Sequence, residues 1–397
     1  MKTVVAETVL LGREAFETLG EVAVIPDRQI GPEHLKDADA LIIRSKTKVT
    51  PELIEGSAVR FVGTATAGFE HMDLPLTSFI APSQSAGASL ASHRVQTLEK
   101  REIGWCAAPG CNADSVADYM TAALLTLHIK HGVELEGKTL GVIGVGQVGS
   151  RVAKRAEALG LRVLLNDPPR AAREGEKGFQ DLADLLAKSD IVTLHVPLIK
   201  EKPWPTLRMA DCRFFEQMKR GTVFINASRG KVLDSDALLH AKTNGVVSHA
   251  VLDVWDPEPA IRADVLSAAT IGTPHIAGYS FEGKLNGTVQ VYHEACHFFE
   301  TAPVWNPALM LPAVAVPKLK INSAEKSDLE VLAEAVTAVY DIGSDQLSIE
   351  DIARFDKLRA HYRVRREFKN TTILLSERRP DLLKRISQAG FASVSGN

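Results

Sequence analysis

The chain has 397 residues, 45% hydrophobic and 24% charged, with a formal net charge of −3 at pH 7, which is typical of a soluble globular protein of two or three domains. Such a charge gives no reason to expect nucleic acid or a membrane surface as a partner. Four cysteines without a CxxC pair, no signal-peptide pattern and no apolar run of membrane-spanning length lead us to expect a cytosolic protein without structural zinc or disulfides.

The first hundred residues alternate strand-like and helix-like segments. The predicted strands are 2–6, 21–25, 39–45 and 60–68, and helical patterns at 12–20 and 31–38 lie between them. This alternation predicts a parallel α/β sheet. Residues 81–97, rich in Ser and Ala and without an apolar period, interrupt the alternation and are predicted to form an inserted surface loop.

A long helix over 112–130 leads into a second α/β unit that begins at Lys138. Its further strands are expected at 190–197, 222–228, 249–254 and 269–275. A helix over 283–300 should return the chain to the first domain. The fold class predicted is therefore α/β, with two Rossmann-like, doubly wound parallel-sheet domains and a cleft between them.

The remaining residues predict a small α+β C-terminal domain. It contains helical patterns at 327–342 and 380–390, a basic stretch at 355–368 and a strand at 371–376. The expected domains are 1–110 for substrate, completed by a helix at 280–302, then 111–279 for NAD, and 303–397.

A dinucleotide fingerprint stands at the start of the second unit. Gly144, Gly146 and Gly149 form a GxGxxG between a predicted strand and a predicted helix, and the next strand ends at Asp167. The glycines permit a tight turn, close approach of a pyrophosphate and close helix packing. Asp167 can accept hydrogen bonds from ribose hydroxyls, which favours NAD over NADP, although Arg170 in the same turn is a residue type that binds a 2′-phosphate.

Three polar residues follow successive predicted strands of this unit: Arg229, Glu258 and His275. Ligands of doubly wound sheets bind beyond the carboxyl ends of the strands. Oxidation of an alcohol by hydride transfer needs a base for the hydroxyl proton, a carboxylate to orient that base, and a cation for an anionic substrate. Taken singly, each residue is equally compatible with a structural role, whereas their joint placement favours catalysis without a metal.

At this point the chain resembles the D-isomer-specific 2-hydroxyacid dehydrogenase family. The matching segments are GVIGVGQVG, DIVTLHVPL, FINASRGKVLD, VLDVWDPEP and TPHIAGYS, with RFVGTATAGFEHMD in the first domain. The resemblance implies that Arg229, Glu258 and His275 are the catalytic residues and that the cofactor is NAD.

Further segments, among them RSKTKV, NDPPR, HIAGYSFEGK and FDKLRAHYRVRREF, resemble the branch of this family that oxidises 4-phosphoerythronate. This resemblance implies substrate contacts from Ser45, Thr66 and Tyr279, and a C-terminal domain that forms a homodimer. It also implies cofactor contacts from Gly144, Gly146, Gln147, Val148, Gly149, Asp167, Val196, Ala227, Ser228, Asp253 and Gly278. The chain departs from the expected pattern at Val196 and Ser228, where threonine and cysteine are usual.

Two basic segments suit a phosphorylated substrate. The first is a turn after a predicted strand, and we expect it to bind the phosphate through Arg44, Ser45, Lys46 and Lys48, although each lysine is equally compatible with a solvated basic turn. The second is the C-terminal run of Arg359, Arg363, Arg365 and Arg366, which we hypothesise reaches the active site of a partner subunit. Two alternatives stay open: a dehydrogenase for 3-phosphoglycerate or an unphosphorylated hydroxy acid, and a non-catalytic NAD-sensing protein resembling the corepressors of this fold.

Overall fold

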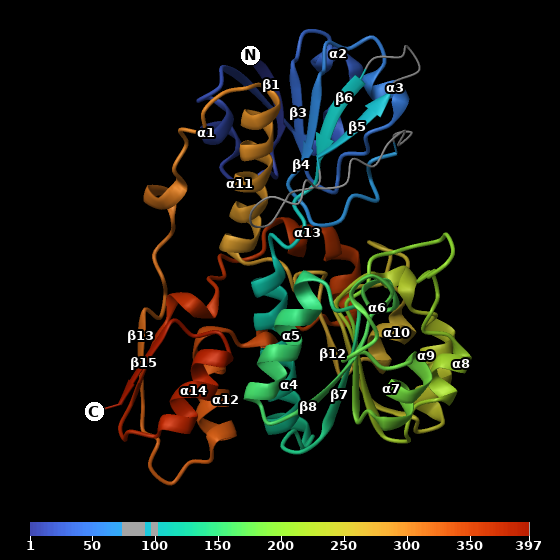
Figure 1. Ribbon diagram of the computed structural model, residues 1–397, viewed down its shortest axis with the longest axis vertical. Helices are drawn as coiled ribbons and strands as arrows, with labels where there is room; N and C mark the ends of the chain where they lie inside the picture. The colour runs from blue at the N-terminus through green and yellow to red at the C-terminus, as the bar shows by residue number, and fades with distance from the viewer. Residues whose placement is uncertain (74–91, 97–101, 397) are drawn as a thin grey trace. The chain divides into compact units, whose positions relative to one another are not determined.

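The structure is a computed structural model that describes residues 1–73, 92–96 and 102–396. The chain forms two compact units. The first contains Met1–Asn112 and Phe281–Ala313, and the second contains Ala113–Ser280 and Val314–Asn397. Each unit contains a six-stranded sheet, and the second also contains a sheet of three strands (Figure 1). The predicted fold class of two parallel α/β domains is confirmed.

The sheet of the first unit has the order β2-β1-β3-β4-β6-β5. Its strands are β1 (Lys2–Ala6), β2 (Glu21–Ile25), β3 (Ala40–Ile43), β4 (Phe61–Thr64), β5 (Ser92–Gln96) and β6 (Glu102–Cys106). All pairings are parallel except that of β5 with β6, which is antiparallel. The first two strands have the bounds that their apolar runs predict.

The predicted loop at 81–97 is wrong over residues 92–96, which form β5; residues 81–91 and 97 lie outside the described residues. Backbone pairing with β6 makes this strand, and such pairing does not require the apolar alternation that was looked for.

Helix α11 (Phe281–Phe298) belongs to the first unit and packs on its sheet. A Cβ on Gly63 of β4 would lie 2.2 Å from Cγ1 of Val291, so the helix can approach the sheet only because this position is glycine. The other helices of this unit are α1 (Gly12–Phe16), α2 (Pro32–Leu35), α3 (Pro51–Ile54) and the 3₁₀ turns Asp27–Gln29 and Pro307–Met310.

The larger sheet of the second unit is parallel throughout, in the order β12-β11-β10-β9-β7-β8. Its strands are β7 (Thr139–Ile143), β8 (Arg162–Asn166), β9 (Ile191–Leu194), β10 (Thr222–Asn226), β11 (Val247–Leu252) and β12 (Ile271–Gly272). The chain passes from β7 to β8 on one side and then to β9 on the other. The topological switch point, where doubly wound sheets bind ligands, is therefore between β7 and β9.

The longest helix of this unit, α4 (Ala113–His131), is buried over most of its length. The other helices that accompany the sheet are α5 (Gln147–Ala158), α6 (Pro168–Glu174), α7 (Leu182–Lys188), α8 (Cys212–Glu216), α9 (Ser235–Thr243) and α10 (Ala263–Ala268). A 3₁₀ turn at Gly230–Val232 follows β10.

The C-terminal residues share a core with this sheet. Helices α12 (Asp328–Val339) and α14 (Pro380–Gln388) contact both the small sheet and helices α4 and α5 (Figure 1). The small sheet consists of the parallel strands β13 (Lys318–Ile321), β14 (Thr372–Leu375) and β15 (Ser393–Gly396). The remaining elements are α13 (Phe355–Ala360) and the 3₁₀ turns Ile342–Asp345, Ile349–Arg354 and Phe368–Asn370. Apolar side chains of α12 and α14 join those of α4 and α5 in one cluster, so residues 314–396 fold onto the second unit.

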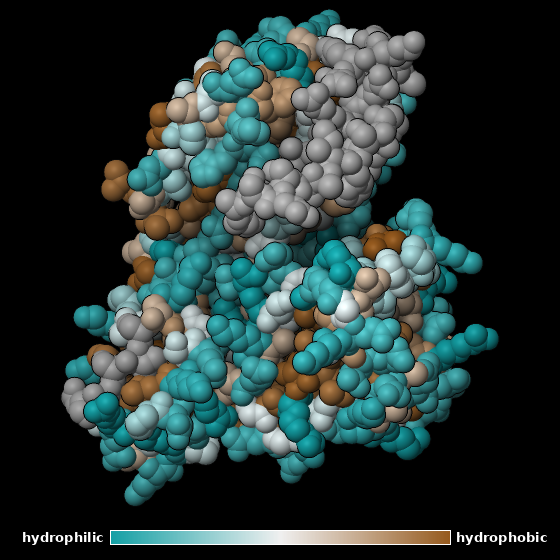
Figure 2. Space-filling model, viewed as in Figure 1, coloured by the Kyte–Doolittle hydropathy of each residue, from teal (hydrophilic) through white to brown (hydrophobic). Residues whose placement is uncertain are grey.

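Figure 2 shows that hydrophilic residues cover most of the visible face of the second unit. In the first unit, the linker after α11 exposes four apolar side chains, those of Val304, Leu309, Met310 and Leu311, and Leu309 is 98% exposed. None of the helices in the described part of the chain combines the length and the apolar character that a membrane crossing requires.

Candidate active site

The glycine loop between β7 and α5 has the geometry that its sequence predicts. Gly144 has φ +85°, and a Cβ there would lie 2.6 Å from the carbonyl oxygen of His195. A Cβ on Gly149 would lie 2.0 Å from the carbonyl oxygen of Gly144, which holds α5 against the loop. A Cβ on Gly146, by contrast, would meet nothing within 4 Å. The loop therefore leaves open space at the position where a pyrophosphate approaches the backbone, beside Gln147 and Val148 of the first turn of α5.

Asp167 follows β8 and ties two turns together. Its Oδ2 accepts a hydrogen bond from the Val145 amide at 2.8 Å, and its Oδ1 accepts one from the Arg170 amide at 2.9 Å. The Arg170 guanidinium donates to Glu174 through Nε and Nη2, and to the Val145 carbonyl through Nη1 at 2.6 Å. Because Arg170 is engaged with Glu174, it is not set up to receive a 2′-phosphate, and the arrangement favours NAD.

Arg229 stands in a loop that Asn226 organises. The buried Asn226 side chain accepts from the amide and hydroxyl of Ser228, at 3.1 and 2.8 Å, and donates to the Arg229 carbonyl at 3.1 Å. The next residue, Gly230, packs so closely that a Cβ would lie 1.8 Å from the carbonyl oxygen of Trp255. The loop of Arg229 therefore lies directly against the loop that leads to Glu258. Ala227 and Ser228 belong to this loop, and Val196 follows β9 as a half-buried residue.

Glu258 and His275 form a hydrogen-bonded pair. Oε2 of Glu258 lies 2.8 Å from Nδ1 of His275, and its Oε1 accepts from the Trp255 amide at 2.9 Å. Burial by itself would raise the pKa of Glu258, but the charge and hydrogen bond of His275, the Arg359 charge and the Trp255 amide hold this pKa below its ordinary value. The carboxylate therefore stays ionised and directs Nε2 of the imidazole away from itself, as a general base requires.

Asp253 anchors the turn that carries His275. Its carboxylate is 1% exposed and accepts hydrogen bonds from the Thr273 hydroxyl, the Ile276 amide and the Ala277 amide at 2.7, 2.7 and 2.9 Å. His275 itself has φ +55°, a left-handed conformation that non-glycine residues rarely adopt. The sequence predicts Asp253 as a cofactor contact, which remains a prediction. The observed contacts instead give Asp253 the role of fixing this turn.

The C-terminal segment contacts the same turn. Arg359 of α13 donates from Nη2 to the Tyr279 hydroxyl at 3.2 Å, and its Nη1 lies 3.9 Å from Oε2 of Glu258. Arg365, 4% exposed, donates from Nη2 to the Ala277 carbonyl at 2.7 Å. Gly278, between these contacts, is half-buried.

The four C-terminal arginines all make contacts within their own chain. Arg359 and Arg365 contact the catalytic turn, Arg363 pairs with Asp345 at 2.9 Å, and Arg366 donates to Asn370 at 3.3 Å. That they reach the active site of a partner subunit stays a hypothesis. The buried Asn226, Trp255 and Thr273, which hold the site in place, were not singled out from the sequence.

The predicted substrate residues of the first unit gather at one edge of its sheet. Arg44 and Ser45 follow β3 and Thr66 follows β4, and Ile43 and Thr64 are paired in these neighbouring parallel strands. The Thr66 hydroxyl lies 2.8 Å from that of Thr64 and donates to the Gly68 carbonyl. Ser45 is exposed and Arg44 is half-buried.

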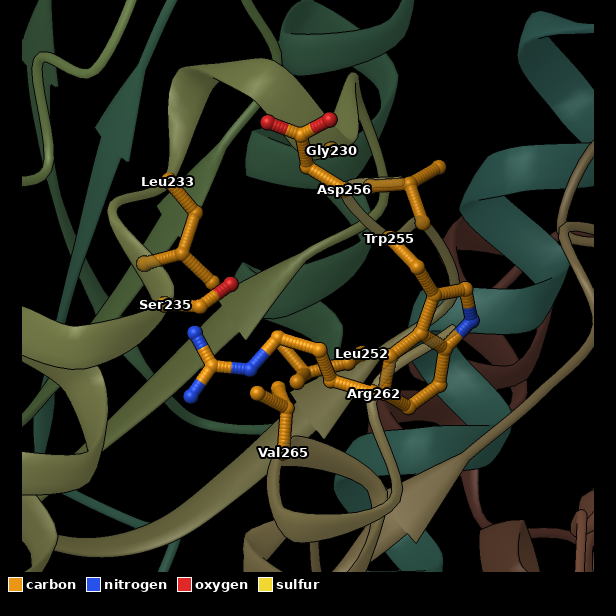
Figure 3. A pocket seen from close by; sticks show the side chains of 9 residues that line it. Gly230, Leu233, Ser235, Leu252, Trp255, Asp256, Arg262 and Val265 are labelled. Carbon is orange, nitrogen blue, oxygen red and sulfur yellow. The ribbon is translucent and has the colours of Figure 1, made fainter. Parts of the chain in front are cut away.

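A small cavity of about 10 Å³ lies behind the loops of Arg229 and Glu258, lined by Gly230, Leu252, Trp255 and Val265 among others (Figure 3). In Figure 3 the Arg262 side chain extends along one wall toward Ser235. A cavity of about 10 Å³ holds at most a single water molecule, so this cavity is not the substrate site.

Comparison with known proteins gives matches along most of the chain. Residues 118–277 match the model described as D-isomer specific 2-hydroxyacid dehydrogenase, NAD binding domain, and residues 11–78 match the catalytic domain of the same family. Residues 310–390 match a domain of unknown function.

Several relatives bear the name erythronate-4-phosphate dehydrogenase. The one from Klebsiella pneumoniae is 40% identical and covers 99% of both chains, and the one from Cronobacter sakazakii is 41% identical, covering 93% of this chain and 92% of its own. Among solved structures, D-lactate dehydrogenase from Aquifex aeolicus in complex with NAD and lactic acid superposes with a TM-score of 0.58 at 27% identity. The match covers 75% of this chain and 95% of that chain.

Proposed function

Because the chain belongs to the D-isomer-specific 2-hydroxyacid dehydrogenase family, we propose that it oxidises 4-phospho-D-erythronate to (R)-3-hydroxy-2-oxo-4-phosphooxybutanoate, a step in pyridoxal 5′-phosphate biosynthesis. NAD is the cofactor of the second unit. The relatives named for this substrate match the chain almost from end to end, including the C-terminal residues that the dehydrogenase domain models do not cover.

The observation on which the proposed chemistry rests is the 2.8 Å hydrogen bond between Glu258 and His275. His275 accepts the proton of the C2 hydroxyl at Nε2 while the hydrogen on C2 leaves as hydride. Glu258 stabilises the imidazolium that forms. NAD, when bound, supplies the hydride acceptor. Arg229 binds the substrate carboxylate and polarises the forming carbonyl.

The remaining substrate contacts follow from the same proposal. Ser45, Thr66 and Arg44 contribute from the first unit, and Tyr279 contributes from the catalytic turn. Gly144, Gly146, Gln147, Val148, Gly149, Asp167, Val196, Ala227, Ser228, Asp253 and Gly278 are the proposed cofactor contacts. The open space at Gly146 supports this set most directly.

The test is to incubate the purified protein with NAD and 4-phosphoerythronate and to follow the absorbance of NADH. 3-Phosphoglycerate and unphosphorylated erythronate serve as parallel substrates. The proposal predicts reduction with 4-phosphoerythronate at a kcat/KM well above both others. Turnover of only 3-phosphoglycerate or only erythronate would show that 4-phosphoerythronate is not the substrate. NAD binding without turnover of any of the three compounds would favour a non-catalytic NAD sensor.

We also propose a cytoplasmic homodimer formed through the C-terminal region. The exposed apolar side chains of the 304–311 linker support an interface, since such side chains gather where partners bind, and the free thiols of Cys106, Cys111, Cys212 and Cys296 suit a reducing compartment. Sedimentation at micromolar concentration should give twice the chain mass, and Leu309→Asp should shift it toward the monomer. A monomeric wild-type protein would contradict this proposal.

A further inference from the structure

Arg359 is a cation of the second unit whose hydrogen bonding is incomplete. Its side chain is 13% exposed, yet within residues 1–73, 92–96 and 102–396 the one hydrogen bond of its guanidinium is to the Tyr279 hydroxyl, at 3.2 Å. The Nε atom is buried and has no partner among the described residues. A guanidinium has five N–H donors, and a buried charge is costly unless an opposite charge and hydrogen bonds compensate it.

Glu258 supplies an opposite charge to Arg359 but no hydrogen bond. It lies 3.9 Å from Nη1 of Arg359, beyond hydrogen-bond distance, and its two oxygens already accept from His275 and from the Trp255 amide. Once His275 takes a proton, the group of Arg359, Glu258 and His275 has a net positive charge. An anion that arrives with the substrate would balance it.

The position of Arg359 is nevertheless well fixed. Its guanidinium carbon lies 5.6 Å from the ring centre of Tyr279 and 5.8 Å from that of the buried Phe355. Arg365 of the same segment is bonded to the Ala277 carbonyl, two residues before Tyr279. The guanidinium and the Tyr279 hydroxyl are thus held together at the catalytic turn.

We propose that Arg359, supplied by the region that matches a domain of unknown function, binds the phosphate of the substrate in the active site of its own chain together with the Tyr279 hydroxyl. This inference rests on the proposed function, in which Arg229 binds the carboxylate and the phosphate is the second anionic group. A planar guanidinium beside a hydroxyl offers a phosphate several charge-assisted hydrogen bonds.

The experiment compares 4-phosphoerythronate with unphosphorylated erythronate in four proteins: wild type, Arg359→Met, Arg359→Lys and Lys357→Met. Lys357 is an exposed cation of the same helix and serves as the charge control. For Arg359→Met we expect kcat/KM to fall on the order of a hundredfold with the phosphorylated substrate and to change less than about twofold with erythronate. Arg359→Lys should lose less, because it keeps the charge but not the planar fork, and Lys357→Met should match wild type.

Equal losses on both substrates would overturn the proposal, because Arg359 would then act through Glu258 and His275. No loss on either would remove Arg359 from the site. Should the wild type oxidise neither compound, the proposed function fails. The role of Arg359 is then tested by calorimetric measurement of 4-phosphoerythronate binding to the NADH complex. Weaker binding by Arg359→Met than by Lys357→Met would support the proposal that Arg359 binds the phosphate. Equal binding by the two variants would overturn it.

Discussion

The glycine loop and the catalytic turn stand at the same edge of one parallel sheet, but they are held in different ways. The loop is fixed within one strand–helix–strand unit, since Gly149 packs on Gly144 and Asp167, 22 positions farther along, bonds to the Val145 amide. The turn around His275 has a similar bond from Asp253 across 24 positions, but it is also bonded by Arg365 of the C-terminal region across 88. A local motif can therefore place a cofactor, whereas the catalytic base depends on residues brought together only by the fold.

Removal of the base in the turn should have the largest effect. In His275→Asn we expect kcat/KM to fall by about 10³ to 10⁴-fold, the range that general base catalysis contributes. Asparagine tolerates the left-handed backbone that His275 adopts, so the turn should persist. Steady-state kinetics measure the loss, and a fluorescence titration should show unchanged NADH affinity. A variant with near wild-type turnover would remove His275 from the mechanism.

Loss of the carboxylate beside the base should be the next largest effect. Glu258→Gln keeps the size of the side chain but not its charge, and we expect kcat/KM to fall about 10²-fold because the imidazolium is no longer stabilised. A fall in kcat with KM unchanged would be the signature of a contribution made in the transition state.

The difference in stability between wild type and Glu258→Gln should depend on pH. Because the pKa of Glu258 is held below its ordinary value, its ionic contribution is complete above about pH 4.5 and is lost as the pH falls through the folded-state pKa. Urea unfolding should therefore show wild type more stable than Glu258→Gln at pH 7, with a difference that shrinks below pH 4.5. A difference that grows in acid would contradict this assignment.

The distant support of the turn should contribute less than the base and its carboxylate. Arg365→Met removes the bond to the Ala277 carbonyl, and we expect the free energy of unfolding to fall by about 2 kcal/mol. As a positioning residue, Arg365 should also affect kcat while leaving the KM for NAD unchanged, and Arg365→Lys should restore part of both losses. Reduced stability with an unaltered kcat would show that Arg365 holds the fold but not the base.

The smallest effect should come from the glycine loop. Gly146→Ala places a methyl group where the chain has no atom within 4 Å, so folding should be unaffected. NAD should bind about tenfold more weakly, equivalent to about 1.4 kcal/mol, because the methyl group occupies the path of the pyrophosphate. A titration with NAD, followed by quenching of the protein fluorescence, measures the affinity. Thermal unfolding measures the stability and serves as the control. Unchanged affinity would place the pyrophosphate elsewhere.

The fold was predictable from the sequence where an element carries its own pattern. The apolar runs at 2–6 and 21–25 became β1 and β2 with those bounds, and the glycine fingerprint adopted the predicted strand–turn–helix. Strand β5 was not predictable, because its pairing with β6 is a backbone contact without an apolar alternation to reveal it. Strand β13 was missed for another reason: its sequence KLKI does alternate polar and apolar residues, but it is only four residues long.

The residues of the candidate site likewise differ in whether the sequence predicts their position. Arg229, Glu258 and His275 each follow a strand of one parallel sheet, and strand order alone placed them together. Arg359 was visible in the sequence only as one arginine among four, and nothing in the spacing of α13 indicates that it contacts Tyr279 and Glu258 of its own chain. Such contacts depend on the packing of α12 and α14 against α4 and α5, which has no local signature.

The most direct test is a crystal structure of the protein with NADH and 4-phosphoerythronate, a complex that cannot react. The account predicts the C2 hydroxyl at about 3 Å from Nε2 of His275, with the carboxylate at Arg229 and the phosphate at Arg359 and Tyr279 of the same chain. A substrate bound with its hydroxyl out of reach of His275, or with its phosphate held by neither Arg359 nor Tyr279 of that chain, would contradict it.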